Sequence, residues 1–209
     1  MIKKILIIIC VFFLFGCEST NINNMTLEEI VNKQISLEPS NTTVNRKGYK
    51  YYLPQEFSVK EDDDYVQKLI SNNNIYYLNI DIVSYYYKNN MDTIHELDDY
   101  EYYEFGDTDK SGYLRITKNN ENFFVELCYN YAIIEVEVEE SNLRYAISRA
   151  ITILNSIKYN DLVIEKYITD NDVDTSETIY KIPEPKNKDN SKNILEYIES
   201  DLEDTDDNE

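Results

Sequence analysis

The sequence predicts an α+β domain, with an antiparallel β-sheet of about six to seven strands, one long C-terminal helix packed on it and a short N-terminal helix. Three observations support this class. Apolar residues of 132–139 alternate with glutamates, which predicts one buried and one wet, acidic face of an antiparallel sheet. Asparagine-containing turns divide 113–139 into three strands. Residues 143–157 keep one apolar stripe at helical spacing.

The expected elements of the domain follow in chain order. Thr26-Leu27-Glu28-Glu29 fits a capping box, and apolar residues at helical spacing follow it, so a helix is expected from Leu27 to Ser36. The folded core is expected to begin near Gly48, and Glu61 to Asp64 should form an acidic turn. The expected strands are Tyr49–Leu53, Phe57–Lys60, Ile75–Tyr87, Glu101–Phe105, Tyr113–Thr117, Phe123–Tyr129 and Ala132–Glu139.

The long helix and an acidic tail end the chain. Ser141 is the expected cap of the helix that carries the 143–157 stripe. The segment Leu162–Ile168 could form one more short strand or pack against the sheet edge. Residues 170–209 hold 14 acidic side chains and 4 lysines. This composition predicts a mostly disordered tail, with a transient helix near Ile194 to Leu202.

The N-terminal segment has the pattern of an export signal. Lys3 and Lys4 precede an unbroken apolar run from Ile5 to Phe15. The run is much shorter than the roughly 20 apolar residues that a membrane-spanning helix needs, and polar residues follow it closely. A plain secretory signal would favour small residues of the Ala-x-Ala type at its cleavage site, whereas here Phe15 stands beside Gly16.

Leu14-Phe15-Gly16-Cys17 resembles the lipobox of bacterial lipoproteins, although Phe15 departs from its usual small or aliphatic residue. The resemblance implies cleavage between Gly16 and Cys17 and a diacylglycerol chain on the Cys17 thiol, which is an adequate anchor because two acyl chains bind membranes firmly. The expected location is the outer face of the bacterial cytoplasmic membrane, or a periplasm-facing membrane in a double-membraned source. The expected organisation is a signal peptide over 1–16, a lipidated tether with a short helix over 17–47, a globular α+β domain over 48–169 and the acidic tail over 170–209.

Composition limits the partners of the chain. It has 20 basic and 40 acidic residues, and a net charge of −20 repels nucleic acid. The expected partners are therefore the membrane, through the lipid anchor, and another envelope protein or a ligand. Twenty tyrosines fit a binding face, but the codon usage of an A/T-rich genome would also produce them. Cys10 leaves with the signal and Cys17 carries lipid, so Cys128 is expected to be a packed thiol without a disulfide.

The body of the chain has a family resemblance of its own. Tyr52-Leu53-Pro54-Gln55-Glu56-Phe57-Ser58-Val59 resembles the opening of PsbP-like lipoproteins, and the helix that ends at Ile153–Lys158 is similar to their last element. DcrB-like lipoproteins share the antiparallel sheet with flanking helices. The resemblance covers residues 48–159 and implies a fold and a binding or scaffolding role, with no functional residues carried over.

The sharpest local motif is Asp107-Thr108-Asp109-Lys110-Ser111-Gly112, which matches the first half of a calcium loop. The candidate Ca²⁺ ligands are Asp107, Asp109 and Ser111. In the second half, Arg115 and Lys118 replace the expected ligands, and Glu121 is a remote acid that could complete the shell. The same residues also suit a hairpin loop, and no cofactor besides Ca²⁺ is expected.

Catalytic signatures are weak. His95 and Cys128 could act as base and nucleophile, but nothing in the sequence places them together. The three glycines after the signal are not spaced as in a phosphate-binding loop. We therefore expect a membrane-anchored, exported lipoprotein that acts as a non-catalytic binding or scaffolding domain of the cell envelope. A Ca²⁺-binding surface lipoprotein and an envelope hydrolase with a carboxylate pair are the alternatives.

Overall fold

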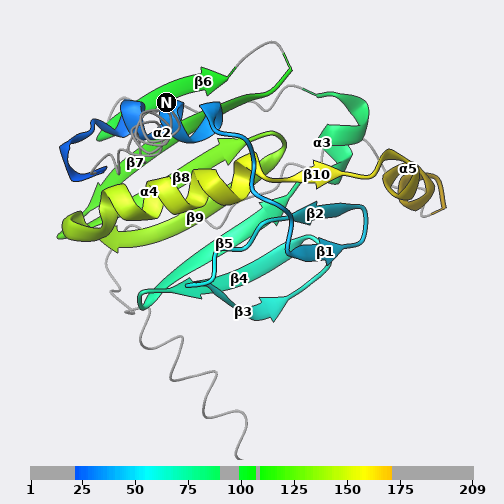
Figure 1. Cartoon of the computed structure of the whole chain (residues 1–209), viewed down its shortest axis with the longest axis horizontal. Coiled ribbons are helices and arrows are strands. Elements are labelled where there is room, and N and C mark those ends of the chain that lie inside the picture. The colour runs from blue at the N-terminus through cyan, green and yellow to red at the C-terminus, as the bar shows by residue number, and fades with distance from the viewer. Residues whose placement is uncertain (1–21, 90–98, 107–108, 171–209) are drawn as a thin grey trace, which may run out of the picture. The chain divides into compact units, whose positions relative to one another are not determined.

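The computed structural model describes residues 22–89, 99–106 and 109–170, and it confirms the α+β class. The main sheet has seven antiparallel strands in the order β3-β4-β5-β9-β8-β7-β6 (Figure 1). Its strands are β3 Ser58–Asp62, β4 Val66–Ser71, β5 Asn74–Ile80, β6 Glu101–Gly106, β7 Ser111–Asn119, β8 Asn122–Tyr129 and β9 Ala132–Glu139. A second sheet, in the order β1-β2-β10, contains β1 Val44–Arg46, β2 Tyr49–Tyr51 and β10 Lys158–Tyr159. The helices are η1 Ile22–Asn24, α2 Leu27–Ser36, α3 Ile82–Tyr87, α4 Glu140–Asn155 and α5 Asp161–Asp170.

One face of the main sheet, which we call the inner face, is covered by helices α4 and α2. Helix α4 packs across β8 and β9, and α2 lies beside α4 and reaches β6 (Figure 1). The predicted apolar stripe of α4 is buried, including Leu143, Ile147 and Ile151. Its burial against the inner-facing side chains of β8 and β9 makes the hydrophobic core.

The predicted N-terminal helix is confirmed over Leu27–Ser36. Its capping box is complete, because Glu29 N donates to Thr26 Oγ1 at 3.1 Å and Thr26 N donates to Glu29 Oε2 at 2.8 Å. The predicted Ser141 cap is wrong, since α4 already begins at Glu140 and Glu139 is its N-cap without a side-chain hydrogen bond. Helix α4 follows β9 directly, so the chain leaves no separate capping residue between them.

The small sheet covers β4 and β5 on the inner face (Figure 1). Tyr51 of β2 donates its hydroxyl proton to Gln67 Oε1 at 2.6 Å, and both residues have 0% exposure. Gln67 Nε2 donates in turn to Asp62 Oδ1, and Arg46 binds the same carboxylate. We call these four residues the inner network, and its hydrogen bonds satisfy polar groups that would otherwise be costly to bury.

One predicted strand is too long, and one of the two alternatives for Leu162–Ile168, the strand, is excluded. The predicted strand Ile75–Tyr87 ends at Ile80, because Asp81 Oδ1 accepts from Ser84 N at 2.8 Å and caps α3. The segment Leu162–Ile168 belongs to helix α5 and is not a strand. Its buried residues Ile164 and Ile168 are four positions apart, which places both on one face of a helix.

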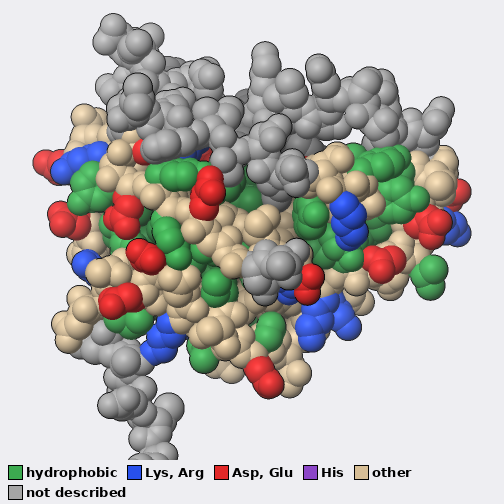
Figure 2. Space-filling model, turned by 90° about the horizontal axis from the view of Figure 1, so that it is seen from above, with side chains coloured by type: hydrophobic (Ala, Val, Ile, Leu, Met, Phe, Trp, Pro, Cys, Tyr) green, Lys and Arg blue, Asp and Glu red, His purple; other side chains and the backbone are tan. Residues whose placement is uncertain are grey.

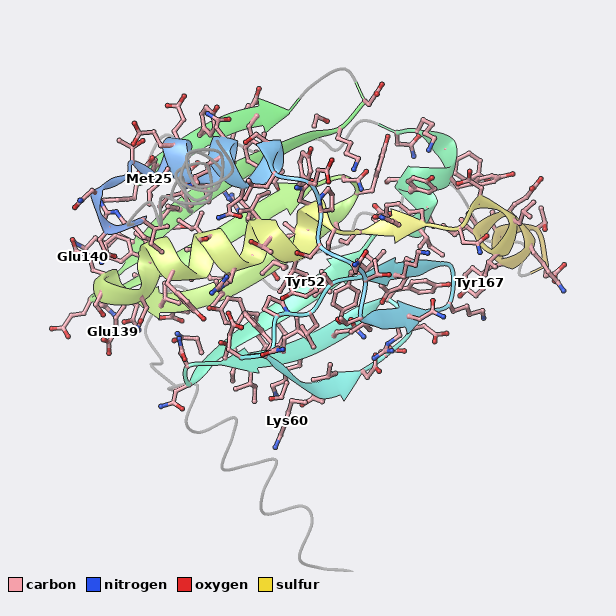
Figure 3. The ribbon with its side chains drawn as sticks, in the orientation of Figure 1. Met25, Tyr52, Lys60, Glu139, Glu140 and Tyr167 are labelled. Carbon is pink, nitrogen blue, oxygen red and sulfur yellow. The ribbon has the colours of Figure 1, made fainter. Side chains whose placement is uncertain are left out.

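Three strands, β1, β4 and β10, have no counterpart in the predictions. In β4 the residues that point to the inner face are Gln67, Leu69 and Ser71, so the apolar alternation that identifies a strand is missing. Strand β3 also extends to Asp62, into the predicted acidic turn, with a bulge between Val59 and Glu61. Lys60 points away from this edge strand (Figure 3), and a bulge and a lysine both hinder pairing with another chain.

None of the helices in the described part of the chain is long and apolar enough to cross a membrane. The predicted signal peptide, with Gly16 and Cys17, lies outside the described residues, and so does the predicted tail from residue 171 onward.

Candidate functional site on the outer face of the sheet

The face of the main sheet opposite α4, which we call the outer face, carries a row of polar side chains. Each member of this row is the direct cross-strand partner of the next, from β3 through to β6. The polar row consists of Glu61, Lys68, Tyr77, Glu135, Glu126, Arg115 and Tyr102. Because direct cross-strand partners are neighbours on one face of a sheet, each side chain can contact the next.

The centre of this row corrects the prediction of a wet, acidic face. Glu126 is 2% exposed and Glu135 is 7% exposed, although both alternate with apolar residues as solvent-facing side chains do. The row therefore places two carboxylates side by side and out of water.

Glu126 has strong partners on both oxygens. Arg115 Nη2 donates to Glu126 Oε2 at 2.7 Å, and the side chain of Arg115 is 19% exposed. The Tyr113 hydroxyl donates to Glu126 Oε1. Burial, and then the charge of Glu126, raise the pKa of Tyr113, so this hydroxyl keeps its proton and remains a donor. Glu126 thus accepts hydrogen bonds from one cationic and one neutral donor.

Glu135 is in the opposite situation. Its Oε1 is buried and has no hydrogen-bond partner. Burial and the neighbouring charge of Glu126 raise the pKa of Glu135 to about 7, while Arg115 lowers it in part. Glu135 therefore exchanges a proton near neutral pH, and its charged form lacks the donors that a buried carboxylate requires.

Cys128 lies on the outer face two residues after Glu126 and is buried, as predicted for a packed thiol. Burial, and then Glu126, raise the pKa of the Cys128 thiol, so the thiolate that a nucleophile needs is disfavoured. The second member of the predicted pair, His95, lies outside the described residues.

The candidate calcium loop is the connection between β6 and β7. Gly106 pairs with Ser111, and the Ser111 carbonyl accepts from Asn130 N at 3.2 Å. Gly106 has a φ of 128°, and a Cβ there would lie 2.2 Å from the Lys110 carbonyl oxygen, so the turn requires glycine. Asp107 lies outside the described residues, so the predicted set of Asp107, Asp109 and Ser111 stays a prediction. Within 22–89, 99–106 and 109–170, no group of three or more His, Cys, Asp or Glu residues could hold a metal.

A second cluster, which we call the tyrosine end, joins α3, β10 and the β8–β9 turn. The Tyr85 ring stacks on Tyr159 with centroids 3.9 Å apart and meets Tyr131 edge to face at 5.6 Å. Lys88 Nζ lies 3.6 Å from the Tyr85 ring centroid, and the Tyr85 hydroxyl donates to Asp161 at 2.7 Å. Hydrophobic side chains gather at this end of the sheet, beside α3 and α5 (Figure 2). These internal contacts give the tyrosine end a structural role, which is to fasten α3 to α5.

An open hollow lies at the start of α2. Its lining residues are Asn24, Met25, Thr26, Glu28, Glu29 and Asn32. The Met25 carbonyl accepts from Arg144 Nε of α4 at 3.1 Å, and Tyr167 of α5 lies at the opposite end of the ribbon in this view (Figure 3). Because Thr26 and Glu29 already bind each other in the capping box, the hollow has fewer free polar groups than its lining suggests. The two buried carboxylates are not among its lining residues.

Comparison of the chain with models of protein families, with curated proteins and with solved structures found no significant match. The resemblances to the lipobox and to PsbP-like lipoproteins therefore remain predictions.

Proposed function

We propose that the protein is a membrane-anchored, exported lipoprotein that acts as a non-catalytic binding or scaffolding domain of the bacterial cell envelope. The observation that carries this proposal is Leu14-Phe15-Gly16-Cys17 after a short apolar run, which supports lipidation of Cys17. The partners are the membrane, through the anchor, and another envelope protein or a ligand. Nucleic acid is not expected, because the chain has a net charge of −20.

The anchor would hold the domain close to the bilayer. The described residues begin with η1 at Ile22, and η1 contacts α4. The chain between Cys17 and Ile22 spans at most about 18 Å when fully extended. A lipidated Cys17 would therefore place the N-terminal ends of α2 and α4 nearest the membrane, with the acidic domain repelled by anionic lipid head groups.

Metabolic labelling tests the anchor. The full chain is expressed in a bacterial host that is fed an alkyne-tagged fatty acid, and its label and membrane association are measured. The wild type and the Cys10→Ala control should carry the label, because Cys10 lies in the predicted signal peptide. Cys17→Ala should lose the label and stay unprocessed. Equal labelling of Cys17→Ala, or no labelling of the wild type, would refute lipidation at this residue.

Chemical cross-linking in intact cells, followed by capture of the tagged full chain from detergent-solubilised membranes, tests the binding role. A defined envelope protein or ligand should be recovered at constant stoichiometry from the wild type. A tagged, unrelated lipoprotein with the same anchor serves as the control for proteins that share only the membrane. Repeated recovery of the bait alone would count against a binding function.

The carboxylate pair supports a second candidate, an envelope hydrolase. Glu126 accepts hydrogen bonds from Arg115 and Tyr113, whereas Glu135 has a pKa raised to about 7, and such a difference in environment can separate a base or nucleophile from an acid. Chromogenic glycosides and esters would test it. Turnover that falls by more than about a hundredfold in both Glu126→Gln and Glu135→Gln would support catalysis, and absence of turnover would remove this candidate.

A further inference from the structure

We propose that Glu135 and Tyr77 form a docking site on the outer face for one cationic side chain, a lysine or arginine of the bound partner. The proposal rests on the binding function proposed above and specifies its partner chemistry. It identifies the partner as a protein that presents a basic side chain to this acidic domain.

Of the three acidic residues in the polar row, Glu61 and Glu126 each bind one of the two cations of the row, and Glu135 does not. Lys68 Nζ lies 2.9 Å from Glu61 Oε1, and Arg115 lies 2.7 Å from Glu126 Oε2. Both cations of the row thus bind other acids, and Glu135 lies between these two ion pairs. A third cation would complete the row.

Burial shows that Glu135 is more than a surface acid. Glu135 is only 7% exposed, and its Oε1 has no hydrogen-bond donor. A buried carboxylate oxygen without a donor is unfavourable, whereas a charge-assisted hydrogen bond from an ammonium or guanidinium group removes that cost. An anion would be repelled by Glu126 and Glu135 together, so the position selects a cation.

Tyr77 supplies the second half of the site. It is the direct cross-strand partner of Glu135, and it is a large side chain that is 43% exposed. A lysine or arginine that reached Glu135 could place its aliphatic stem, or the charge itself, over the Tyr77 ring. The exposed Tyr77 ring is thus the neighbour of Glu135 that a partner's side chain can contact from solvent.

Proton exchange should be linked to this docking. The charged and titratable groups around Glu135 are Glu126 and Cys128 on β8, Arg115 and Tyr113 on β7, Tyr77 on β5 and Lys68 on β4. Without a cation, Glu135 holds its proton up to near neutral pH. A docked cation requires the carboxylate, so binding releases one proton to solvent and becomes tighter as the pH rises through 7.

The probe is n-butylammonium, with n-butylguanidinium as a second cation and n-pentanol as an uncharged control of similar length. Each is titrated into the full lipidated chain in non-ionic detergent micelles, with ¹³C-carboxyl-labelled glutamate observed by NMR. Both cations should shift the Glu135 carboxyl signal, and pentanol should not. The affinity for n-butylammonium should rise about tenfold from pH 6 to pH 8, because a carboxyl with a pKa near 7 is mostly protonated at the first pH and mostly ionised at the second.

Variants assign the effect to the site. Glu135→Gln should abolish cation binding and its pH dependence, whereas Glu137→Gln should preserve both. Glu137 is a matched control because it lies two residues along β9 on the same face, and its Oε1 already accepts from Asn122 Nδ2 at 3.0 Å. Tyr77→Leu should weaken binding about threefold to tenfold, and Tyr77→Phe should retain it, since phenylalanine preserves the ring. Circular dichroism of each variant checks that it is folded.

Two results would overturn the docking site. One is binding of n-butylammonium to Glu135→Gln with wild-type affinity, and the other is a Glu135 titration that neither cation alters. If Glu135→Gln still captured the wild-type partner from cells, the docking site would be wrong while the binding function stood. Failure of the wild type to capture any partner, with cation binding intact, would refute the binding function alone.

Discussion

The two faces of the main sheet both carry acidic side chains, but the hydrogen bonding of these carboxylates differs. The Asp62 side chain is 39% exposed, whereas Glu126 and Glu135 are buried. On the inner face, Asp62 receives hydrogen bonds from Gln67 and Arg46, which lower its pKa although burial acts to raise it. On the outer face, Glu135 has an oxygen without a donor, and burial together with Glu126 raises its pKa to about 7. The inner network is closed within the fold, while the outer pair lacks one positive partner.

The presence or absence of hydrogen-bond donors distinguishes polar groups that stabilise the fold from polar groups that can bind a ligand. A closed network stabilises one conformation, and its members have no remaining capacity for a ligand. An incomplete network keeps a cost that only a proton or an external group can remove. Mutations on the two faces should therefore differ in how their effects depend on pH.

The largest expected effect comes from removing Arg115, the cation that binds Glu126 on the outer face. Arg115→Leu would leave Glu126 without its charged partner beside a second buried acid, and we expect a loss of about 3–5 kcal/mol in the free energy of unfolding at pH 8. The loss should be smaller at pH 5, where the acids can take up protons. Urea denaturation at both pH values measures it. The control Arg149→Leu breaks a more exposed ion pair with Glu56 and should cost at most about 1 kcal/mol. Equal losses in the two variants would contradict the special position of Arg115.

Breaking the inner network should cost somewhat less. Gln67→Ala removes a fully buried side chain and leaves the Tyr51 hydroxyl without its acceptor, and we expect a loss of about 2–3 kcal/mol. The milder Tyr51→Phe should cost about 1–2 kcal/mol, because it removes one hydroxyl and leaves Gln67 in place. Urea denaturation at pH 5 and pH 8 should give similar losses, since neither substituted side chain changes its charge in this range. A strong pH dependence would show that the inner network is not the closed structure described above.

Neutralising Glu135 should stabilise the protein only at higher pH. The pKa of Glu135 is about 7 in the folded chain and 4.5 in its reference state, so its contribution to stability is complete below pH 4.5 and is lost as the pH rises through 7. Glutamine does not ionise, so the free energy of unfolding of Glu135→Gln should not fall with pH through this group. We therefore expect it to exceed the wild type by up to about 3 kcal/mol at pH 9 and to match it near pH 4. Urea denaturation across this range measures the difference, and parallel pH profiles would show that Glu135 titrates normally.

Much of the fold could be predicted because its segments follow simple periodicities. Helix Leu27–Ser36 has a capping box and an apolar stripe, and the strands of 111–139 alternate between clear turns. Strand β4 could not be predicted, because the polar residues Gln67 and Ser71 point inward, and Gln67 is bound there by the distant Tyr51. The structure of β4 therefore depends on tertiary contacts and not on the apolar periodicity of its own sequence.

The outer pair illustrates the same limit at the candidate site. The pairing of Tyr129 with Ala132 fixes the β8–β9 register and thereby places Glu126 opposite Glu135, so this juxtaposition was within reach of the sequence. The burial of both acids was not, since alternating glutamates on an antiparallel strand usually face water. With 40 acidic residues in the chain, composition alone could not single out these two.

The smallest expected effect concerns the other cation of the polar row. Lys68 is bound to Glu61, whose side chain is 64% exposed, so Lys68→Ala should change the free energy of unfolding by at most about 0.5 kcal/mol. In the polar row, Lys68 forms its ion pair with Glu61. The NMR titration midpoint of Glu135 should therefore not change in Lys68→Ala. A midpoint that rises in Lys68→Ala would mean that the charge of Lys68 already stabilises the Glu135 carboxylate within the fold. The outer face would then be closed like the inner one, and no external cation would be needed.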